Sequence, residues 1–373
     1  MILQELSVNN YRNLEKNIFK FDSNINYIYG QNAQGKTNLL ESIWMLTGAR
    51  SFRGSKDGDL INFNINNNIK QASIKSKIII NNINYNITVN FGDNKRKIFI
   101  NEIPQKSPSD AIGKFRVILF TPLNLNLIKD GPDNRRKFLD AAICQLRPSY
   151  TKILIEYNKL LKHRNILLKN KNSQNLEYLN IWDEKLSLSG AKIILSRLEY
   201  LEKLKIKSQE IYSEISSKQE NLNIKYNFYK LNNIKNNYNL ENIYNILLEN
   251  IKKNYDLDIK FGYTTIGPHK DDLEIFLNNK LTKKFGSQGQ QRSVVLSLKL
   301  SEADILEHEI KEPPVILLDD VMSELDNYRQ EYLLTKILNK QVFITGCDEI
   351  LFKNFENLKT INKLNINCGK LVR

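Results

Sequence analysis

The sequence predicts an α/β fold in which a phosphate-binding lobe is joined to a second, helical lobe. The pattern G-x-x-x-x-G-K-T runs from Gly30 to Thr37, between a predicted strand and a predicted helix. Four aliphatic residues at 315–318 precede two aspartates, which is typical of a buried parallel strand with a site at its carboxyl end. Residues 135–218 are dense in Lys and Glu and carry apolar residues at helical spacing, which indicates a helical lobe.

The N-terminal region, residues 1 to about 115, is predicted to consist mostly of short strands. Alternating apolar residues at 25–29 lead into the first glycine of the loop, and "ASIKSKIIINNINYNITVNF" (72–91) indicates a hairpin. One helix interrupts the strands, because the apolar residues between 39 and 46 follow helical spacing directly after the loop.

The rest of the chain is predicted to alternate between the two lobes. An Asn-rich stretch at 217–245 is expected to form surface loops. After Gly267, strands return, followed by the polar turn "KFGSQGQQR", a helix, the apolar strand "PVILL" and "QVFITG" as a last strand. The expected domains are residues 1–115 (lobe I, N-terminal part), 116–294 (mainly helical lobe II) and 295–373 (lobe I, C-terminal part).

Composition narrows the class of protein. Lys and Arg total 55 against 41 for Asp and Glu, a net charge of +14, which favours a polyanionic partner. Cys144, Cys347 and Cys368 form no CxxC pair, which fits a reducing compartment. No apolar run reaches membrane-spanning length and the N-terminus lacks the apolar core of a signal peptide, so we expect a cytoplasmic protein without a membrane span.

The glycine loop has the residue types that phosphate binding requires. Glycines let backbone N–H groups close around phosphates, Lys36 supplies a positive charge, and the Thr37 hydroxyl is a ligand for Mg²⁺. Asp319, at the end of the apolar strand, is expected to hold Mg²⁺ through its water shell, and Asp320 to orient an attacking water. Without the loop, an ordinary strand ending in solvated acids would be the better interpretation.

A second anion-seeking turn lies far downstream. Gly286 and Gly289 flank Ser287, a good N-cap for the following helix, and a helix N-terminus attracts anions. The order of phosphate loop, S-x-G-Q, acidic strand and "SELD" resembles the ABC ATPase superfamily. That resemblance implies an ABC-type ATPase head, in which the signature motif of one subunit closes over the nucleotide of another, and places the D-loop at Ser323 to Asp326.

The motifs as a set resemble the RecF family of bacterial gap-repair ATPases, which is related to SMC heads, over nearly the whole chain. The matching stretches are "NYRN" (10–13), the loop with "TNLLE", "ARSFR" (49–53), "GPDNRRKFLD" (131–140), "WDEKLSLSGAKI" (182–193), "GPHKDDLE" (267–274), "SQGQQR" (287–292) and "LLDDVMSELD" (317–326). No long coiled-coil arm is expected, because such an arm needs hundreds of helical residues.

The RecF resemblance implies an ATP-dependent homodimer that binds double-stranded DNA near single-strand gaps. It further implies the mediator RecR, functional links to RecO, and help in loading the RecA recombinase. The implied nucleotide-binding residues are Arg12, Asn13, Gly30, Gln31, Asn32, Ala33, Gln34, Gly35, Lys36, Thr37 and Asn38, with Ser287, Gln288, Gly289, Gln290, Gln291 and Arg292 as the signature acting in trans. The implied cofactors are ATP and Mg²⁺, and an aspartate rather than a glutamate at 320 suggests slow hydrolysis.

Two features leave alternatives open. Arg135, Arg136 and Lys137 of "NRRK" are candidate DNA contacts, although a solvated helix start is the better interpretation of this stretch. A nucleotide-binding subunit of an ABC transporter shares the loop, signature and acidic strand, but usually has LSGGQ and a switch histidine where this chain has "SQGQQR" and Thr345. A P-loop kinase is disfavoured by the paired signature.

Overall fold

The computed structural model describes residues 1–63, 71–92, 95–169, 179–229, 239–347 and 361–372. The chain forms two compact units: unit 1 comprises Met1–Asn124 and Lys299–Arg373, and unit 2 comprises Leu125–Leu298. The expected domain boundaries at 116 and 294 therefore differ from the observed ones. Strand β8 (Val117–Phe120) was assigned to the helical lobe, but it pairs with β12 (Val315–Leu318) and so belongs to unit 1.

Unit 1 contains two six-stranded sheets. The antiparallel sheet has the order β2-β1-β4-β5-β6-β7, and the second sheet has the order β15-β14-β3-β13-β12-β8, parallel except at β15. The remaining elements of this unit are β1 (Ile2–Asn9), β2 (Asn17–Lys20), β3 (Ile25–Tyr29), α1 (Lys36–Met45), β4 (Ala72–Ile80), β5 (Ile83–Gly92), β6 (Lys95–Ile100), β7 (Ile103–Pro104), α11 (Asn327–Ile337), β13 (Val342–Gly346), β14 (Ile361–Asn367) and β15 (Lys370–Val372).

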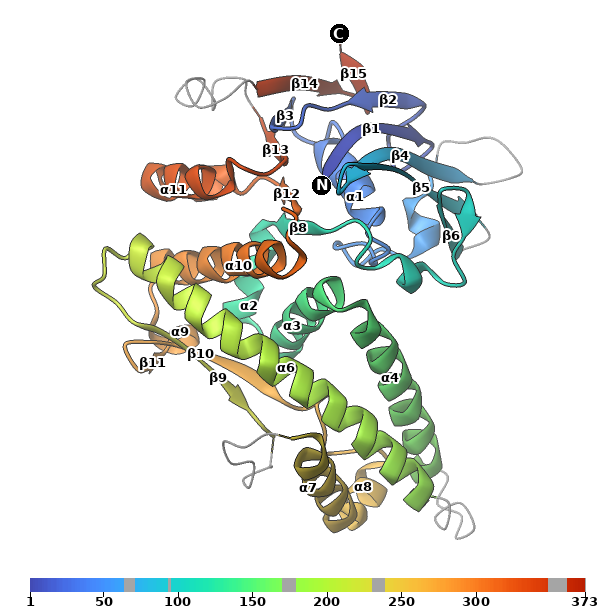
Figure 1. Ribbon diagram of the computed structural model, residues 1–373, viewed down its shortest axis with the longest axis vertical. Helices are drawn as coiled ribbons and strands as arrows, with labels where there is room; N and C mark the ends of the chain where they lie inside the picture. The colour runs from blue at the N-terminus through green and yellow to red at the C-terminus, as the bar shows by residue number, and fades with distance from the viewer. Residues whose placement is uncertain (64–70, 93–94, 170–178, 230–238, 348–360, 373) are drawn as a thin grey trace. The chain divides into compact units, whose positions relative to one another are not determined.

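Helix α1 joins the two sheets through one hydrophobic core. Leu39, Leu40 and Ile43 are fully buried in a cluster that also contains residues of both sheets, such as Ile74 and Leu317. Figure 1 shows α1 lying against β1 and β4. These three residues follow helical spacing and anchor one face of α1 in the core. Because α1 begins at Lys36, its anchoring also holds the glycine loop at the carboxyl end of β3.

Unit 2 is mainly helical and has a three-stranded antiparallel sheet in the order β11-β10-β9. Its elements are α2 (Asn126–Lys129), α3 (Pro132–Leu146), α4 (Pro148–Lys169), α6 (Leu179–Ile215), β9 (Leu222–Asn227), α7 (Leu240–Lys253), α8 (Tyr255–Phe261), β10 (Asp272–Leu277), β11 (Lys280–Leu281), α9 (Thr282–Phe285) and α10 (Gln288–Ile310), whose C-terminal part belongs to unit 1. The longest described helix is α6, with 37 residues. Among the described residues, no helix is both long and apolar enough to cross a membrane.

Several sequence-based expectations for local structure can be compared with these elements. The predicted hairpin at 72–91 is confirmed as β4 and β5. The expectation of loops across 217–245 is wrong at both ends, where β9 and the start of α7 lie, while 230–238 falls outside the described residues. The expectation that "QVFITG" is the last strand is also wrong, because β14 follows and pairs with β3. Asn-rich sequence hides the alternation in these segments, and tertiary pairing decides their structure.

A buried ionic cluster ties the helices of unit 2 together. The guanidinium of Arg164 is fully buried and binds Asp183 (Nε to Oδ1, 2.6 Å) and Asp258 (Nη1 to Oδ2, 2.6 Å). These three residues lie on α4, α6 and α8. Burial raises the pKa of Asp183, and the adjacent Arg164 opposes that rise. Arg164 is therefore the shared cation of two buried carboxylates.

We expect Arg164→Met to destabilise the protein by about 3–5 kcal/mol, because two buried carboxylates lose their shared cation. The loss should be larger at pH 8 than at pH 5. Without the cation the folded-state pKa of Asp183, which burial already raises, rises further, so stability is lost as pH climbs from about 4 through that pKa. Chemical denaturation at both pH values measures this. The matched control is Arg147→Met, which breaks the exposed pair with Glu199 and should change stability by less than about 1 kcal/mol.

Candidate nucleotide-binding site

The glycine loop joins β3 to α1 through residues in the left-handed backbone region. Gly30 has φ 149° and Gly35 has φ 111°. A Cβ at Gly30 would lie 2.3 Å from the Ile366 carbonyl oxygen, and one at Gly35 would lie 2.8 Å from Asn13 Oδ1. Both positions therefore require glycine for conformation and for space. Gly35 supplies no capping side chain to α1, so the first N–H groups of the helix can bind an anion.

Lys36 folds back over this loop. Its Nζ donates hydrogen bonds to the carbonyl oxygens of Gly30 (2.7 Å) and Gln31 (2.9 Å), and the residue is buried. A buried ammonium without an acidic partner is costly unless its protons are bonded. The loop carbonyls meet that requirement and hold the positive charge beside the N-terminus of α1.

Thr37 and Asp319 meet although they are far apart in the sequence. The Thr37 hydroxyl, in the first turn of α1, donates to Oδ1 of Asp319 at 2.9 Å, and Asp319 directly follows β12. Burial raises the pKa of Asp319, while the hydrogen bond from Thr37 lowers it. One hydroxyl and one carboxylate at this separation fit Mg²⁺, which takes few protein ligands and keeps waters and phosphate oxygens for the rest of its octahedron.

Asp320 has a strained backbone that Thr345 supports. Its φ is 52°, in the left-handed region that costs a non-glycine residue about 1 kcal/mol or more. The Thr345 hydroxyl accepts the Asp320 N–H at 2.9 Å and lies 3.2 Å from Asp319 Oδ1 and 3.3 Å from Asp320 Oδ1. Strand β13 therefore places one hydroxyl against the two acids that follow β12, because the two strands are neighbours in the sheet.

Arg12 and Asn13 approach the loop from the segment after β1. Arg12 binds the fully buried Glu41 of α1 through Nε (2.8 Å) and Nη2 (3.0 Å). Asn13 Oδ1 accepts from Asn38 Nδ2 at 2.7 Å. Both residues thus contact α1, and Asn13 also packs against Gly35. Of the loop residues, Asn32 Oδ1 accepts from the Cys347 thiol, and Gln34 contacts the turn after β14.

The proposed signature turn begins α10 in unit 2. Ser287 and Gln290 form a reciprocal capping box: Ser287 N–H donates to Gln290 Oε1 at 2.7 Å, and Gln290 N–H donates to Ser287 Oγ at 3.2 Å. Gln291 is buried and its amide donates to the Gly286 carbonyl at 3.1 Å. Ser287 and Gln288 are exposed, so the start of α10 is accessible within its own unit.

Comparison with known proteins finds relatives that match this chain over nearly its whole length. The family model described as RecF/RecN/SMC N terminal domain matches residues 2–368. The DNA replication and repair protein RecF of Alkaliphilus oremlandii (strain OhILAs) is 40% identical over 348 residues, 92% of this chain and 93% of that protein. RecF of Clostridium novyi (strain NT) is 41% identical over 357 residues, 95% of each chain. The chain belongs to the RecF family.

Solved structures agree with the RecF assignment. The structure of the recombination mediator protein RecF-ATPrS in the RecFOR pathway matches with a TM-score of 0.90 and 38% identity, covering 99% of this chain and 97% of that one. An SmcHead bound to the C-winged helix domain of ScpA matches with a TM-score of 0.57 at 14% identity, which shows the fold alone. The expected fold class, an SMC-like ABC ATPase head, is confirmed. Full-length similarity to RecF decides against the transporter subunit and the kinase.

Several polar residues of the RecF motifs are buried or half-buried and have structural partners. Arg197 of α6 binds both carboxylate oxygens of Asp140 (2.9 Å each), and Tyr226 donates to Asp271 at 2.9 Å. Burial raises the pKa of Asp271 to about 6 and lowers the pKa of His269 to about 4. His269 therefore stays neutral near pH 7, and its Nε2 lies 3.1 Å from the Thr264 carbonyl, which fits a turn anchor.

The three "NRRK" candidates for DNA contact differ in burial and in bonding partners. Arg135 is buried and binds both oxygens of Asp272, at 2.7 and 2.9 Å, as well as the Asp130 carbonyl. Arg136 donates to the Asp271 carbonyl at 2.6 Å. Only Lys137 is largely exposed, and it pairs with Asp133 one helical turn earlier. Arg135 and Arg136 hold α3 to the start of β10, which leaves Lys137 as the most accessible of the three candidates.

The D-loop residues have local structural partners. Ser323 Oγ donates to the Asp320 carbonyl at 2.9 Å, and the Asp326 carboxylate caps α11 by accepting from Arg329 N–H at 2.9 Å. Both side chains are exposed. Their cap and turn contacts fix the loop that follows β12, and leave open the D-loop role that the resemblance implies.

Sequence reasoning missed two groups that support the site. The turn between β14 and β15 braces the loop, since Gly369 N–H donates to the Gln34 carbonyl at 2.8 Å and a Cβ at Gly369 would lie 2.0 Å from the Asn13 carbonyl oxygen. From the sequence, Thr345 stands out only because it replaces the switch histidine of transporter subunits. A polar residue that ends a buried strand next to β12 was the available signal, because parallel strands present their carboxyl ends at one edge.

Proposed function

We propose that this protein is an ATP-dependent DNA repair and recombination factor that uses slow ATP hydrolysis as a switch. The observation that carries the proposal is the convergence of Lys36, Thr37, Asp319 and Asp320 at the carboxyl edge of one parallel sheet. In this assignment Lys36 binds the β- and γ-phosphates, and Thr37 and Asp319 hold Mg²⁺, which stabilises charge on the phosphates. Asp320 orients the attacking water.

The ATP-bound state is proposed to be a homodimer. The exposed N-terminus of α10, with Ser287, Gly289 and Gln290, would complete the nucleotide site of a second copy. The γ-phosphate then supplies the differential affinity that shifts monomer to dimer, and ADP does not. The relatives with ATP and ATPrS are described as recombination mediators of the RecFOR pathway, which supports nucleotide binding and a role in recombination by similarity.

The DNA partner is proposed to be duplex next to a single-strand gap. RecR and RecO are the expected partners in the cytoplasm, and loading of RecA is the expected outcome. The net charge of +14 supports binding through phosphates, which is independent of sequence and weakened by salt.

Analytical ultracentrifugation with and without ATP and gapped DNA tests this function. We expect a monomer alone or with ADP, a dimer with ATP and Mg²⁺, and a larger complex when gapped DNA is added. DNA binding should weaken steeply between low and moderate salt. A protein that stays monomeric with ATP, or binds gapped DNA equally at all salt concentrations, would contradict the proposal.

Asp320→Asn is expected to bind ATP normally and to hydrolyse it at least about 100-fold more slowly, because an amide cannot accept a proton from the attacking water. Equilibrium binding of a fluorescent ATP analogue and single-turnover hydrolysis measure the two steps separately. Asp110→Asn is the matched control, since it makes the same change at an exposed carboxylate of the same unit that has no place in the site. Unchanged hydrolysis in Asp320→Asn would move the catalytic role to another residue.

Thr345 is expected to act by positioning the two aspartates. Thr345→Val keeps the shape but removes the hydroxyl that accepts the Asp320 N–H. We expect kcat to fall by about tenfold or more with little change in ATP affinity, and Thr345→Ser to restore most of the rate. Equal loss in the Ser and Val variants would show that the methyl packing of Thr345, and not its hydroxyl, matters.

A further inference from the structure

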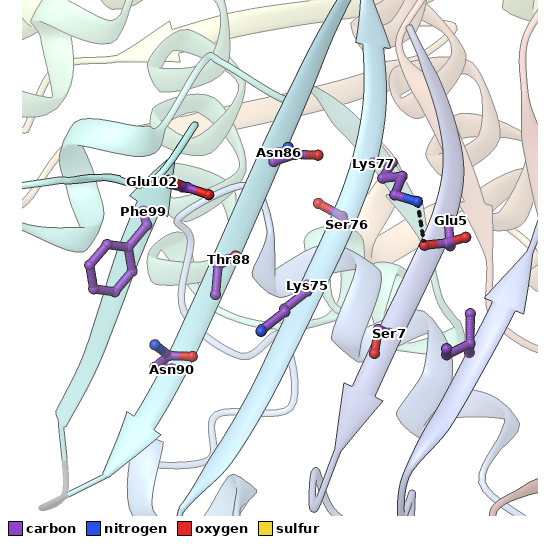
Figure 2. Close-up of a pocket in the computed structure, with 11 residues that line it drawn as sticks. Glu5, Ser7, Lys75, Ser76, Lys77, Asn86, Thr88, Asn90, Phe99 and Glu102 are labelled. Carbon is purple, nitrogen blue, oxygen red and sulfur yellow. Dashed lines mark ion pairs between the residues drawn. The ribbon is translucent and has the colours of Figure 1, made fainter.

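The outer face of the antiparallel sheet in unit 1 is a distinct polar surface. Alternate residues of each strand point inward, such as Leu6, Ile74 and Val89, which are fully buried. Their neighbours point outward and surround a shallow hollow of about 550 Å³. Figure 2 shows the residues of this hollow, which come from β1, β2, β4, β5 and β6 and from the turn after β6. All of them belong to unit 1 and none contributes to the nucleotide site.

The strand registers arrange these outward residues in rows. The central row is Ile18, Ser7, Lys75, Thr88 and Phe99, joined by the pairs Ser7↔Ile18, Ser7↔Lys75, Lys75↔Thr88 and Thr88↔Phe99. The rows on either side are Lys20, Glu5, Lys77 and Asn86, and Asn9, Ser73, Asn90 and Lys97. We call these three rows, with Lys95 and Glu102, the outer sheet face.

This face is basic and rich in hydrogen-bonding groups. It carries five lysines, at 20, 75, 77, 95 and 97, against the acids Glu5 and Glu102. Glu5 neutralises Lys77 by an ion pair of 3.0 Å. Lys75 lies at the centre, and among the described residues no carboxylate is within ion-pair distance of it. Ser, Thr and Asn side chains surround Lys75 and can donate to phosphate oxygens.

Two apolar groups lie in the same central row as Lys75. The Phe99 ring is half-buried, and Ile18 is 57% exposed. An aromatic ring on a sheet surface beside a cation is the arrangement on which the bases of a single strand stack while the cation meets the backbone. The hollow is lined by residues of a single sheet and the turn after β6, which suits a strand crossing the sheet better than an enclosed small molecule.

We propose that the outer sheet face binds a single strand of nucleic acid, with Lys75 and Lys97 on its phosphates and Phe99 against a base. In a protein that acts at gaps, this face would take the unpaired strand. The inference rests on the DNA-binding function proposed above and adds a site to it.

The test uses the full-length protein and a labelled oligothymidylate, with a duplex of equal length for comparison. In Lys75→Gln/Lys97→Gln, the dependence of log affinity on log salt for the single strand should be shallower by about 1.4, from about 0.7 per phosphate contact.

Phe99→Leu, which keeps apolar volume without a ring, should weaken single-strand binding by about tenfold and leave duplex binding unchanged. Lys159→Gln/Lys192→Gln removes the same charge from exposed positions of unit 2. This control should change neither the affinity for the single strand nor its salt dependence.

Each outcome separates this site from the wider function. Equal losses in the face and control variants would reduce the effect to net charge and overturn the site. Loss of duplex binding alone in the face variant would overturn the single-strand assignment. If wild-type protein binds duplex in an ATP-dependent manner while the face variants bind the single strand normally, only this inference fails. If wild-type protein binds no DNA at all, the proposed function fails. Normal thermal unfolding and ATP binding confirm that the variants are folded.

Discussion

Lys36→Met is expected to lose ATP binding. The variant removes the ammonium that bonds the Gly30 and Gln31 carbonyls at 2.7 and 2.9 Å and that we assign to the β- and γ-phosphates. Charge-assisted hydrogen bonds contribute about 1.5–3 kcal/mol each, so two of them correspond to a loss of about 100-fold or more in affinity. Isothermal titration with ATP and Mg²⁺ measures this directly.

The control for Lys36→Met is Lys114→Met, an exposed lysine of the same unit that has no place in the site. Its ATP affinity should equal that of the wild type. Thermal unfolding of both variants without nucleotide shows whether the loop still folds once its carbonyls lose the ammonium. A folded Lys36→Met protein with normal ATP affinity would remove the phosphate-loop assignment.

Ser287→Arg is expected to bind ATP as a monomer and to fail in ATP-dependent dimerisation and hydrolysis. Ser287 is exposed at the start of α10, so a folded monomer has room for the larger side chain. In the proposed dimer the same position approaches the γ-phosphate of a second copy, where an arginine side chain would block close approach. Ser287→Ala controls for the lost helix cap, which is expected to cost about 1 kcal/mol of stability and to leave much of the dimer.

Mixing Ser287→Arg with Lys36→Met protein tests whether sites are shared between subunits. In a mixed dimer, one site contains both lesions and the other is wild type at both positions. ATPase activity should therefore recover in part, although each variant alone is inactive. A normal ATP-dependent dimer of Ser287→Arg would show that "GSQGQQR" is not a signature acting in trans.

Local sequence determined the parts of this protein that depend on neighbours along the chain. The glycines of the loop, the apolar stripe of α1 and the four aliphatic residues of β12 each specify one element, and the elements occur where the patterns predict them. The capping pair of Ser287 and Gln290 likewise follows from residues three positions apart. The family could be inferred for the same reason, because its motifs are short and local.

The tertiary structure alone decided which polar residues face the site and which are consumed inside the fold. Thr345 reaches both acids only because β13 lies beside β12, and the β14–β15 turn braces the loop across more than 300 residues of sequence. The opposite case is Arg135, which the sequence alone predicts to be a surface cation. In the structure it is buried, because it pairs with Asp272, a residue distant in sequence. Residue type sets what a side chain can bond, but long-range pairing of strands and buried charges sets what it does bond, because an unpaired buried charge costs more than any local preference supplies.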